Sequence, residues 1–491
     1  MVGRKKIPFL KSGQDKMKHI KVTICLIVAL MTASAPAAVN YVPEDYPNIQ
    51  AAIDACQDYD AVIIAPGTYS GTGNRNLRFN GKAITVSGTN VSGENATVID
   101  CMNIARGFLF FLGEDENSKI TTLTIKNGYG FSGGAVYCYN NSSPIITNCT
   151  FTENSAVFGG AIACEHTNTK PKITNCNIKG NSALVGGGAI YCNSASPKIS
   201  NCIIVENQAP HGGAIYSHNI GSPVVAGCTI SQNIATLSAG AIHCYEASNL
   251  TLDNTILWQD AAPYAPEILV GNGGTTTTLI RISYCDIQDP LRSVINESGG
   301  TVDWQLGNIN TDPCFVGTTD YHLLEGSLCI NAGDPAFVPQ PAETDIDGDP
   351  RISGAGIDIG ADEYMLGMTV NINVMPKALN LKSNRSWITC TVKLEDIYNI
   401  NDINTETLKL NAKVEPARIN IDNEQQKMTA KFSYYKVRDI LDPDQTSATL
   451  TLTGEFNNGM NFEGSDTIKI VQPVATSSRH NLQSRKRIQH K

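Results

Sequence analysis

A repeat of about 26 residues in the middle of the chain constrains the fold more than any other feature. The phrase Gly-Gly-Ala recurs with steps of 26, 28, 25 and 27 residues, and its last copy reads Ala-Gly-Ala. A fixed period of this length is typical of solenoids, whose repeats bury their interior against their neighbours. The copies begin at Gly133, Gly159, Gly187, Gly212 and Ala239.

Each repeat has the composition of short strands and turns, with β-branched runs broken by Gly, Asn, Ser and Pro. In PKITNCNI, Ile173 and Cys176 are three residues apart, so a straight strand would place them on opposite faces. Cys176 and Ile178 share a face. If all three are interior, the chain bends near Asn175, and Asn tolerates the left-handed conformation that such a bend needs. The same bend is expected at Asn148 and Asn201.

We therefore expect an all-β fold, a right-handed parallel β-helix of about eight or nine coils of ~26 residues each. The segment PNIQAAIDAC before the repeats predicts a short helix with Ile49, Ala52 and Ile53 on its apolar face. Such a helix would cap the open end of the stack and protect its edge.

Cysteines recur in two columns of the repeat, and we expect them to fill the interior as reduced thiols, since cysteine behaves as a small apolar residue. No Cys-x-x-Cys pair occurs, which disfavours zinc. Cys314 and Cys329 lie outside both columns and are the specific disulfide candidates, with free thiols as the equal alternative. One column holds Cys138, Cys164, Cys192 and Cys244 with Ser217 in register, and the other holds Cys149, Cys176, Cys202 and Cys228.

The N-terminus predicts export. Lysines precede the apolar run VTICLIVALM and the small residues TASAPAAV, as in a secretory signal peptide cleaved after Ala37 or Ala38. Translation starts at Met1 or Met17. No other stretch is long enough to span a membrane, so the mature chain is expected to be secreted or located at the cell surface. The net charge of -9 disfavours nucleic acid as a partner.

Several segments resemble known families. YPNIQAAIDACQDYDAVIIAPGTYSG resembles the first segment of pectate-lyase-like β-helix proteins, and the repeats are similar to those of bacterial β-helix surface proteins. NINTDPCFVGTTDYHLLEGSLCINAGDP and TDIDGDPRISGAGIDIGADEY together resemble the choice-of-anchor Q segment of secreted bacterial β-helix proteins. The resemblance covers roughly residues 41–365. It implies the fold and export, and says little about activity.

The C-terminal part of the sequence lacks the repeat of the central coils. About seven alternating strands, WITCTVKL among them, predict a small β-sandwich, and the polar basic end predicts disorder. The expected regions are a signal peptide (1–38), the β-helix with its capping helix (39–310), a choice-of-anchor Q-like closing segment (311–365), the β-sandwich (366–473) and a disordered basic tail (474–491).

Catalytic groups are scarce in the central coils. The resemblance implies that a lyase would need an Asp-rich calcium site and a basic residue, often Arg. Residues 131–252 contain no Asp and residues 107–280 contain no Arg, so no lyase site is carried over. Glu153 and Glu206 lie two coils apart, about 9.6 Å between backbones. That is near the upper limit for an inverting hydrolase, roughly 6.5–9.5 Å. The favoured interpretation places both at solvated corners.

Tyr137, Tyr191 and Tyr216 share one outward-facing column, with His243 in register and Ala163 interrupting it. Stacked aromatic rings in an open groove would bind sugar rings. The favoured interpretation is that they stabilise the sheet or pack beneath a loop. Exposed corners are expected for the histidines of the repeats, His166, His211, His218 and His243.

The segment TDIDGDP has alternating acidic residues, Asp345, Asp347 and Asp349, as in part of a calcium loop. Gly356 stands where the loop's bidentate Glu would be. A turn with solvated carboxylates is the favoured interpretation, calcium is the alternative, and no other cofactor is expected.

Together these features predict an exported, non-catalytic protein with a binding or structural role at the cell surface or outside the cell. Its partner would be an extracellular polysaccharide or a cell-surface component. A polysaccharide hydrolase or lyase is the alternative.

Overall fold

The computed structural model describes residues 37–471, except 92, 94–95, 272–276, 342, 366, 382, 384, 395–397, 443–444 and 458–460. The basic tail and nearly all of the expected signal peptide lie outside the described residues. Within the described part, no helix is both long and apolar enough to cross a membrane.

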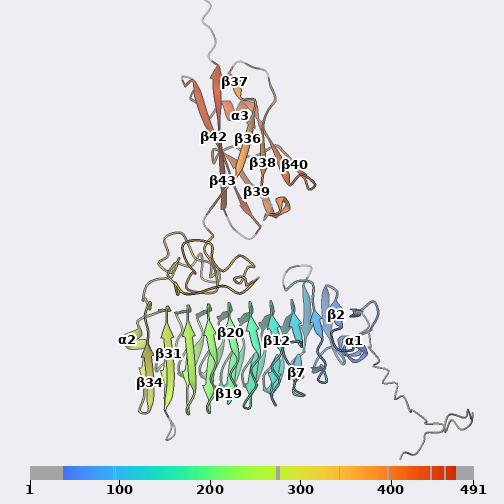
Figure 1. The fold of residues 1–491 in the computed structure, drawn as a ribbon, viewed down its shortest axis with the longest axis vertical. Helices are drawn as coiled ribbons and strands as arrows, with labels where there is room; N and C mark the ends of the chain where they lie inside the picture. Colours follow the sequence, from blue (N-terminus) through green and yellow to red (C-terminus); the bar gives the residue numbers. More distant parts are fainter. Residues whose placement is uncertain are drawn as a thin grey trace, which may run out of the picture. The chain divides into compact units, whose positions relative to one another are not determined.

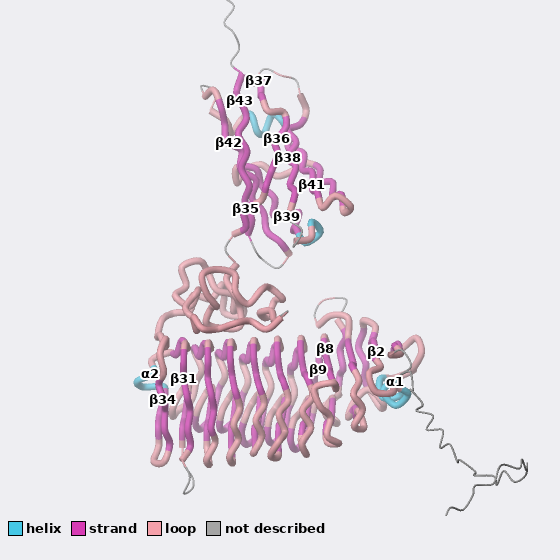
Figure 2. Tube along the Cα trace, viewed as in Figure 1, coloured by secondary structure: helices cyan, strands magenta, loops and turns pink. Residues whose placement is uncertain are grey.

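The chain first winds into a stack of coils whose strands form four parallel sheets, here called A to D (Figures 1 and 2). Sheet A has 11 strands and sheets B and C have nine each, so there are about ten coils, slightly more than predicted. Along each central coil the chain passes from sheet A to B, then D, then C.

Sheet A consists of β1 (Val39–Val42), β2 (Ala61–Ile64), β5 (Thr85–Ser87), β8 (Lys119–Thr121), β12 (Ile145–Thr147), β16 (Lys172–Thr174), β20 (Lys198–Ser200), β24 (Val224–Ala226), β28 (Asn249–Asp253), β31 (Thr278–Ser283) and β34 (Gly300–Trp304). Sheet B consists of β3 (Gly67–Ser70), β6 (Thr97–Asp100), β9 (Thr124–Lys126), β13 (Thr150–Thr152), β17 (Asn177–Lys179), β21 (Ile203–Val205), β25 (Thr229–Ser231), β29 (Ile256–Trp258) and β32 (Asp286–Ile287).

Sheet C consists of β4 (Leu77–Arg78), β7 (Phe108–Phe110), β11 (Val136–Cys138), β15 (Ile162–Glu165), β19 (Ile190–Asn193), β23 (Ile215–His218), β27 (Ile242–Cys244), β30 (Ile268–Val270) and β33 (Val294–Asn296). Sheet D consists of β10 (Tyr129–Ser132), β14 (Ser155–Phe158), β18 (Ser182–Gly186), β22 (Gln208–His211) and β26 (Ile234–Ser238). A short helix, α2 (Pro290–Ser293), precedes β33.

The Gly-Gly-Ala phrase marks the corner between sheets D and C. The first residue of each copy has a positive φ, as at Gly187 (67°), a conformation that favours glycine, although Ala239 adopts it in the last copy. The second has no room for a side chain, because a Cβ at Gly160 would lie 2.1 Å from the carbonyl oxygen of Gly188 in the next coil. The repeat that dominates the sequence therefore follows from backbone packing between coils.

The corner between sheets A and B confirms the predicted bend. Asn148, Asn175 and Asn201 have φ values of 52°, 51° and 53°. The cysteines that follow them, with the neighbouring isoleucines, are buried in one continuous core. Both cysteine columns consist of buried free thiols, as predicted.

A second column of asparagines forms a buried ladder after sheet B. Each side-chain amide donates from Nδ2 to Oδ1 of the next rung at 2.8–2.9 Å, and the last rung is a carboxylate. Each Oδ1 also accepts a bond from a backbone N–H. The ladder thus satisfies polar backbone groups that the coil encloses. Its rungs are Asn154, Asn181, Asn207, Asn233 and Asp260.

The predicted capping helix is α1 (Ile49–Ala55), with Ile49, Ala52 and Ile53 buried as expected. Asn48 caps it, since its side chain accepts a hydrogen bond from the backbone N–H of Ala51. The helix contributes its apolar face to the same core as the first coils.

The C-terminal part has two sheets that share one hydrophobic core. One consists of β35 (Met368–Thr369), β43 (Asn461–Val471), β42 (Ser447–Phe456) and β39 (Ile403–Leu410), with β37 (Ala378–Asn380) also paired to β43. The other is wholly antiparallel and consists of β36 (Asn371–Met375), β38 (Trp387–Lys393), β41 (Lys427–Ser433) and β40 (Arg418–Asp422). Two short helices, η1 (Ile400–Asp402) and α3 (Tyr434–Arg438), complete it.

Candidate functional site

The described residues of the closing segment (311–365) form loops that lie against the coils (Figure 2). Asn175 donates from Nδ2 to Thr344 Oγ1 at 2.9 Å, and Asn201 donates to the Thr344 carbonyl at 2.9 Å. Gln232 donates to the carbonyl of Thr318 at 2.9 Å. The asparagines that bend the chain therefore also hold the closing segment.

Inside the closing segment, two buried groups fix the loops. Arg351 and Glu363 form an ion pair at 3.0 Å, with both side chains 1% exposed. Asp345 is also buried, and its Oδ1 accepts three backbone N–H groups, from Asp347 to Asp349. Burial raises the pKa of Asp345 to about 7. The predicted turn is present, but Asp345 is enclosed by its own backbone and is not solvated.

A polar groove of about 760 Å³ lies between sheet B and the closing segment. Its floor includes Asn177 and Lys179 of β17, and its far wall includes Tyr321, His322 and Asp347. Within the described part of the chain, neither Asn177 Oδ1 nor Tyr321 Oη has a hydrogen-bond partner, although both atoms are buried. Burial raises the pKa of Tyr321 to about 12, so its hydroxyl remains a donor at neutral pH.

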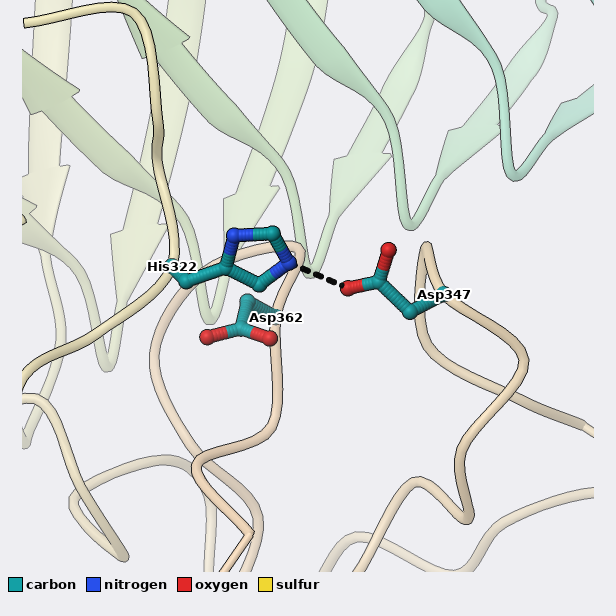
Figure 3. A group of neighbouring side chains, drawn as sticks. All are labelled: His322, Asp347 and Asp362. Atoms are coloured by element: carbon teal, nitrogen blue, oxygen red, sulfur yellow. Dashed lines mark hydrogen bonds and ion pairs between the residues drawn. The ribbon is translucent and has the colours of Figure 1, made fainter. Parts of the chain in front are cut away.

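One edge of the groove carries a histidine among carboxylates (Figure 3). His322 Nε2 lies 2.8 Å from Asp347 Oδ2, and His322 Nδ1 bonds the carboxylate of Asp320. The hydrogen bond to Asp347 is the main reason that the pKa of His322 is raised to about 10. Asp362, 7% exposed, lies beside them and has its pKa raised to about 6 by burial.

The two glutamates proposed for a hydrolase lie at corners, as favoured. Glu153 and Glu206 have φ values of 56° and 57°, and Glu153 is exposed. Glu206 forms an ion pair with Lys179 at 3.0 Å. Neither of them is among the residues that line the groove.

The tyrosine column has the predicted register but is not open. Tyr191 and Tyr216 are 4% and 9% exposed, and sheet D packs on them so closely that a Cβ at Gly186 of β18 would lie 2.2 Å from the Tyr216 ring. Phe158 stacks on Tyr191 at 4.8 Å, and Tyr137 bonds Glu165 at 3.1 Å. Tyr191 and Tyr216 therefore do not form an open aromatic platform, because sheet D covers both rings.

The expectation of exposed corners is wrong for three of the four histidines. His211, His218 and His243 surround Tyr216, with His243 stacked on it at 5.1 Å and only 6% exposed. Burial lowers the pKa of His243 to about 3. His166 alone lies at an exposed corner as expected, with a φ of 75°.

The disulfide candidates are free thiols in the structure. Cys329 donates to the Asp286 carboxylate at 3.2 Å, whereas Cys314 bonds the carbonyl of Asp312 at 3.4 Å. Their sulfurs thus have separate partners, and the disulfide is not formed. Among the predicted acidic residues, Asp347 alone belongs to the cluster with His322 and Asp362.

Sequence reasoning missed Asn177, Tyr321 and His322 as groove residues. The signal for Asn177 was weak, because a polar residue on the outer face of a strand is ordinary. Tyr321 and His322 lie in a segment without period, where only the fold shows what they face.

Comparison with known proteins bears on the fold. Residues 61–219 match the family model described as right handed beta helix region. Among solved structures, the crystal structure of pectate lyase Pel9A is 13% identical with a TM-score of 0.39, over 67% of this chain and 97% of that chain. No curated protein matches the chain. With its parallel sheets, the family match identifies the coiled part of this chain as a right-handed parallel β-helix.

Proposed function

We propose that this is an exported protein that binds a neutral polysaccharide in the polar groove and does not cleave it. The observation that carries the proposal is the groove itself, whose lining combines uncharged polar side chains from consecutive coils with apolar ones such as Ile203 and Val205. Its lining includes Thr122, Thr150, Asn177 and Asn175.

The shape of the groove suits an extended ligand. Thr122, Thr150, Asn177 and Ile203 come from successive coils, so the groove follows the stack for three steps. At about 4.8 Å a step this is about 14 Å, enough for a short run of sugar units. Hydroxyl groups of a sugar both donate and accept hydrogen bonds, as the amide and hydroxyl groups of this lining require.

The charges favour a neutral polymer over a polyanion. Two described lining residues are cationic at neutral pH, and both are already paired: Lys179 with Glu206, and His322 with Asp347. Asp320 and Asp347 add negative charge at the edge. A carboxylate-rich polymer would meet repulsion there, since like charges at short range are unfavourable.

The test is binding of the mature chain, from residue 39, to a panel of neutral and acidic polysaccharides by affinity electrophoresis. Asn177→Ile copies the residue at the same register in the next coil, Ile203, so the sheet tolerates it. It should weaken binding about tenfold, the effect of one lost hydrogen bond. The matched control Asn249→Leu copies Leu279 in the same way on sheet A.

Unchanged binding by Asn177→Ile, or equal losses in both variants, would contradict binding in the groove. Export is checked separately by the N-terminus of the protein recovered outside the cell, which should begin near residue 38 or 39. Recovery of the whole chain inside the cell would contradict it.

Hydrolysis of the same polymer is the second candidate. It is favoured by the carboxylates of Asp320 and Asp347, which reach the groove from irregular loops. Release of reducing ends by the parent chain, abolished in Asp347→Asn, would establish hydrolysis and replace the non-catalytic proposal.

A further inference from the structure

We propose that His322, Asp347 and Asp362 form a binding site for a divalent transition-metal ion such as Zn²⁺. One ligand atom from each of the three side chains lies within 4.8 Å of the others. Figure 3 shows the imidazole and both carboxylates gathered at one point of the closing segment. This proposal is independent of what binds in the groove.

The spacing suits one ion after a small adjustment. Zinc binds imidazole nitrogen and carboxylate oxygen at about 2.0–2.2 Å, so two ligands of one ion lie about 3–4 Å apart. His322 Nε2 and Asp347 Oδ2 are now 2.8 Å apart, joined by a hydrogen bond. An ion would replace the shared proton and move the two atoms apart by up to about 1.2 Å.

The chemistry of the ligands selects the class of ion. An imidazole suits zinc, iron, nickel and copper, whereas calcium takes six to eight oxygen ligands. One nitrogen and two carboxylates match the mixed sites of zinc and similar ions. Of the alternating aspartates that suggested calcium, only Asp347 belongs to this cluster, and Asp345 instead holds the turn through three backbone N–H groups.

His322 and Asp362 each have a hydrogen-bond partner that orients the side chain, as the ligands of metal sites usually do. Asp320 accepts from His322 Nδ1, which fixes the ring and leaves Nε2 toward the cluster. Carboxylates placed behind metal-bound histidines in this way orient the ring and increase its basicity. The backbone N–H of Leu323 holds Asp362 Oδ2 at 2.9 Å. Without a metal, the same contacts form a histidine cation between two carboxylates, which is the competing interpretation.

The scaffold also holds the ligands rigidly. Asp347 is carried by the turn that Asp345 organises. Asp362 directly precedes Glu363, which is fixed by its buried ion pair with Arg351. Prepositioned ligands lose little conformational entropy when an ion binds, and this favours affinity.

The experiment is titration of the mature, chelator-treated chain with ZnCl₂ by calorimetry, with CaCl₂ and MgCl₂ as separate arms. We expect one Zn²⁺ per chain, bound at least about tenfold more tightly than Ca²⁺. Asp320→Asn should weaken zinc binding about 10- to 100-fold through misorientation of His322, and Asp347→Asn should weaken it further. His211→Gln, in the other histidine cluster, should bind zinc like the parent.

A second readout separates a metal site from an ion pair. Zinc should raise the thermal midpoint of the parent and of His211→Gln but not of Asp347→Asn, which remains folded because Asp347 is exposed. No zinc binding by the parent, zinc binding unchanged in Asp347→Asn, or tighter binding of Ca²⁺ than Zn²⁺ would overturn the proposal.

Discussion

Replacing Asn181 by alanine should lower the free energy of unfolding by about 4 kcal/mol. Asn181 is 1% exposed and is an internal rung of the asparagine ladder. Its Oδ1 accepts from the backbone N–H of Asn154 at 3.0 Å and from Asn154 Nδ2 at 2.9 Å. Its own Nδ2 donates to the carbonyl of Phe151 at 3.0 Å and to Asn207 Oδ1 at 2.9 Å.

The magnitude depends on which partners keep another bond. The backbone N–H of Asn154 loses the acceptor that the ladder gives it, which costs about 1–3 kcal/mol in a buried site. Asn154 Nδ2 still donates to Ile125, and Asn207 Oδ1 still accepts from the backbone N–H of residue 181. Each of those groups therefore loses only part of its bonding, about 1 kcal/mol apiece.

The assay is urea unfolding of the mature chain followed by far-ultraviolet circular dichroism, with refolding checked because long repeat arrays depart from two-state behaviour. The control is Asn249→Ala, an exposed asparagine on β28, which should change stability by less than about 0.5 kcal/mol. If Asn181→Ala costs no more than this control, the ladder does not stabilise the stack and the reasoning is refuted.

Two further predictions concern buried ionisable groups. Burial raises the pKa of Asp260 to about 7, so stability should fall as the pH rises from about 4 through 7, since the unfolded chain ionises first. Asp260→Asn should flatten this decline in thermal melts, and parallel curves for parent and variant would contradict it. The thiols of both columns are buried, and burial raises the pKa of Cys202 well above its usual value. In the folded mature chain a thiol reagent should modify Cys314 alone at pH 7, and the other thiols should react only after unfolding.

The sequence predicted the stack of coils because its constraints are periodic. The interior residues around Asn175 are spaced so that only a bent chain buries them all, and the structure has that bend at the same position in successive coils. The cap was predictable for a similar reason, since Ile49, Ala52 and Ile53 follow a helical period.

The role of the asparagine column was not predictable in the same way. Asn suits both an exposed corner and a buried ladder, so its period does not show which one applies. In the structure the residue before each rung takes the corner conformation, as at Glu153 and Glu206, and the asparagine points inward. For the tyrosine column, the sequence predicted which residues are in register. It did not show whether their outward face is open or covered by sheet D.

The candidate site was beyond sequence reasoning for a geometric reason. Tyr321, Asp347 and Asp362 come from separate loops of a segment without a period, and Asn177 comes from a strand far earlier in the chain. Contacts between the closing segment and the coils bring them together, among them the hydrogen bonds of the corner asparagines and of Gln232.

The most direct test of binding in the groove is hydrogen exchange of the mature chain with and without the polysaccharide that it binds. The account predicts slower exchange in peptides covering β17 and residues 319–322, with no change in peptides covering the tyrosine column. Protection confined to the tyrosine column, or to the C-terminal sheets, would place the ligand elsewhere and contradict the account.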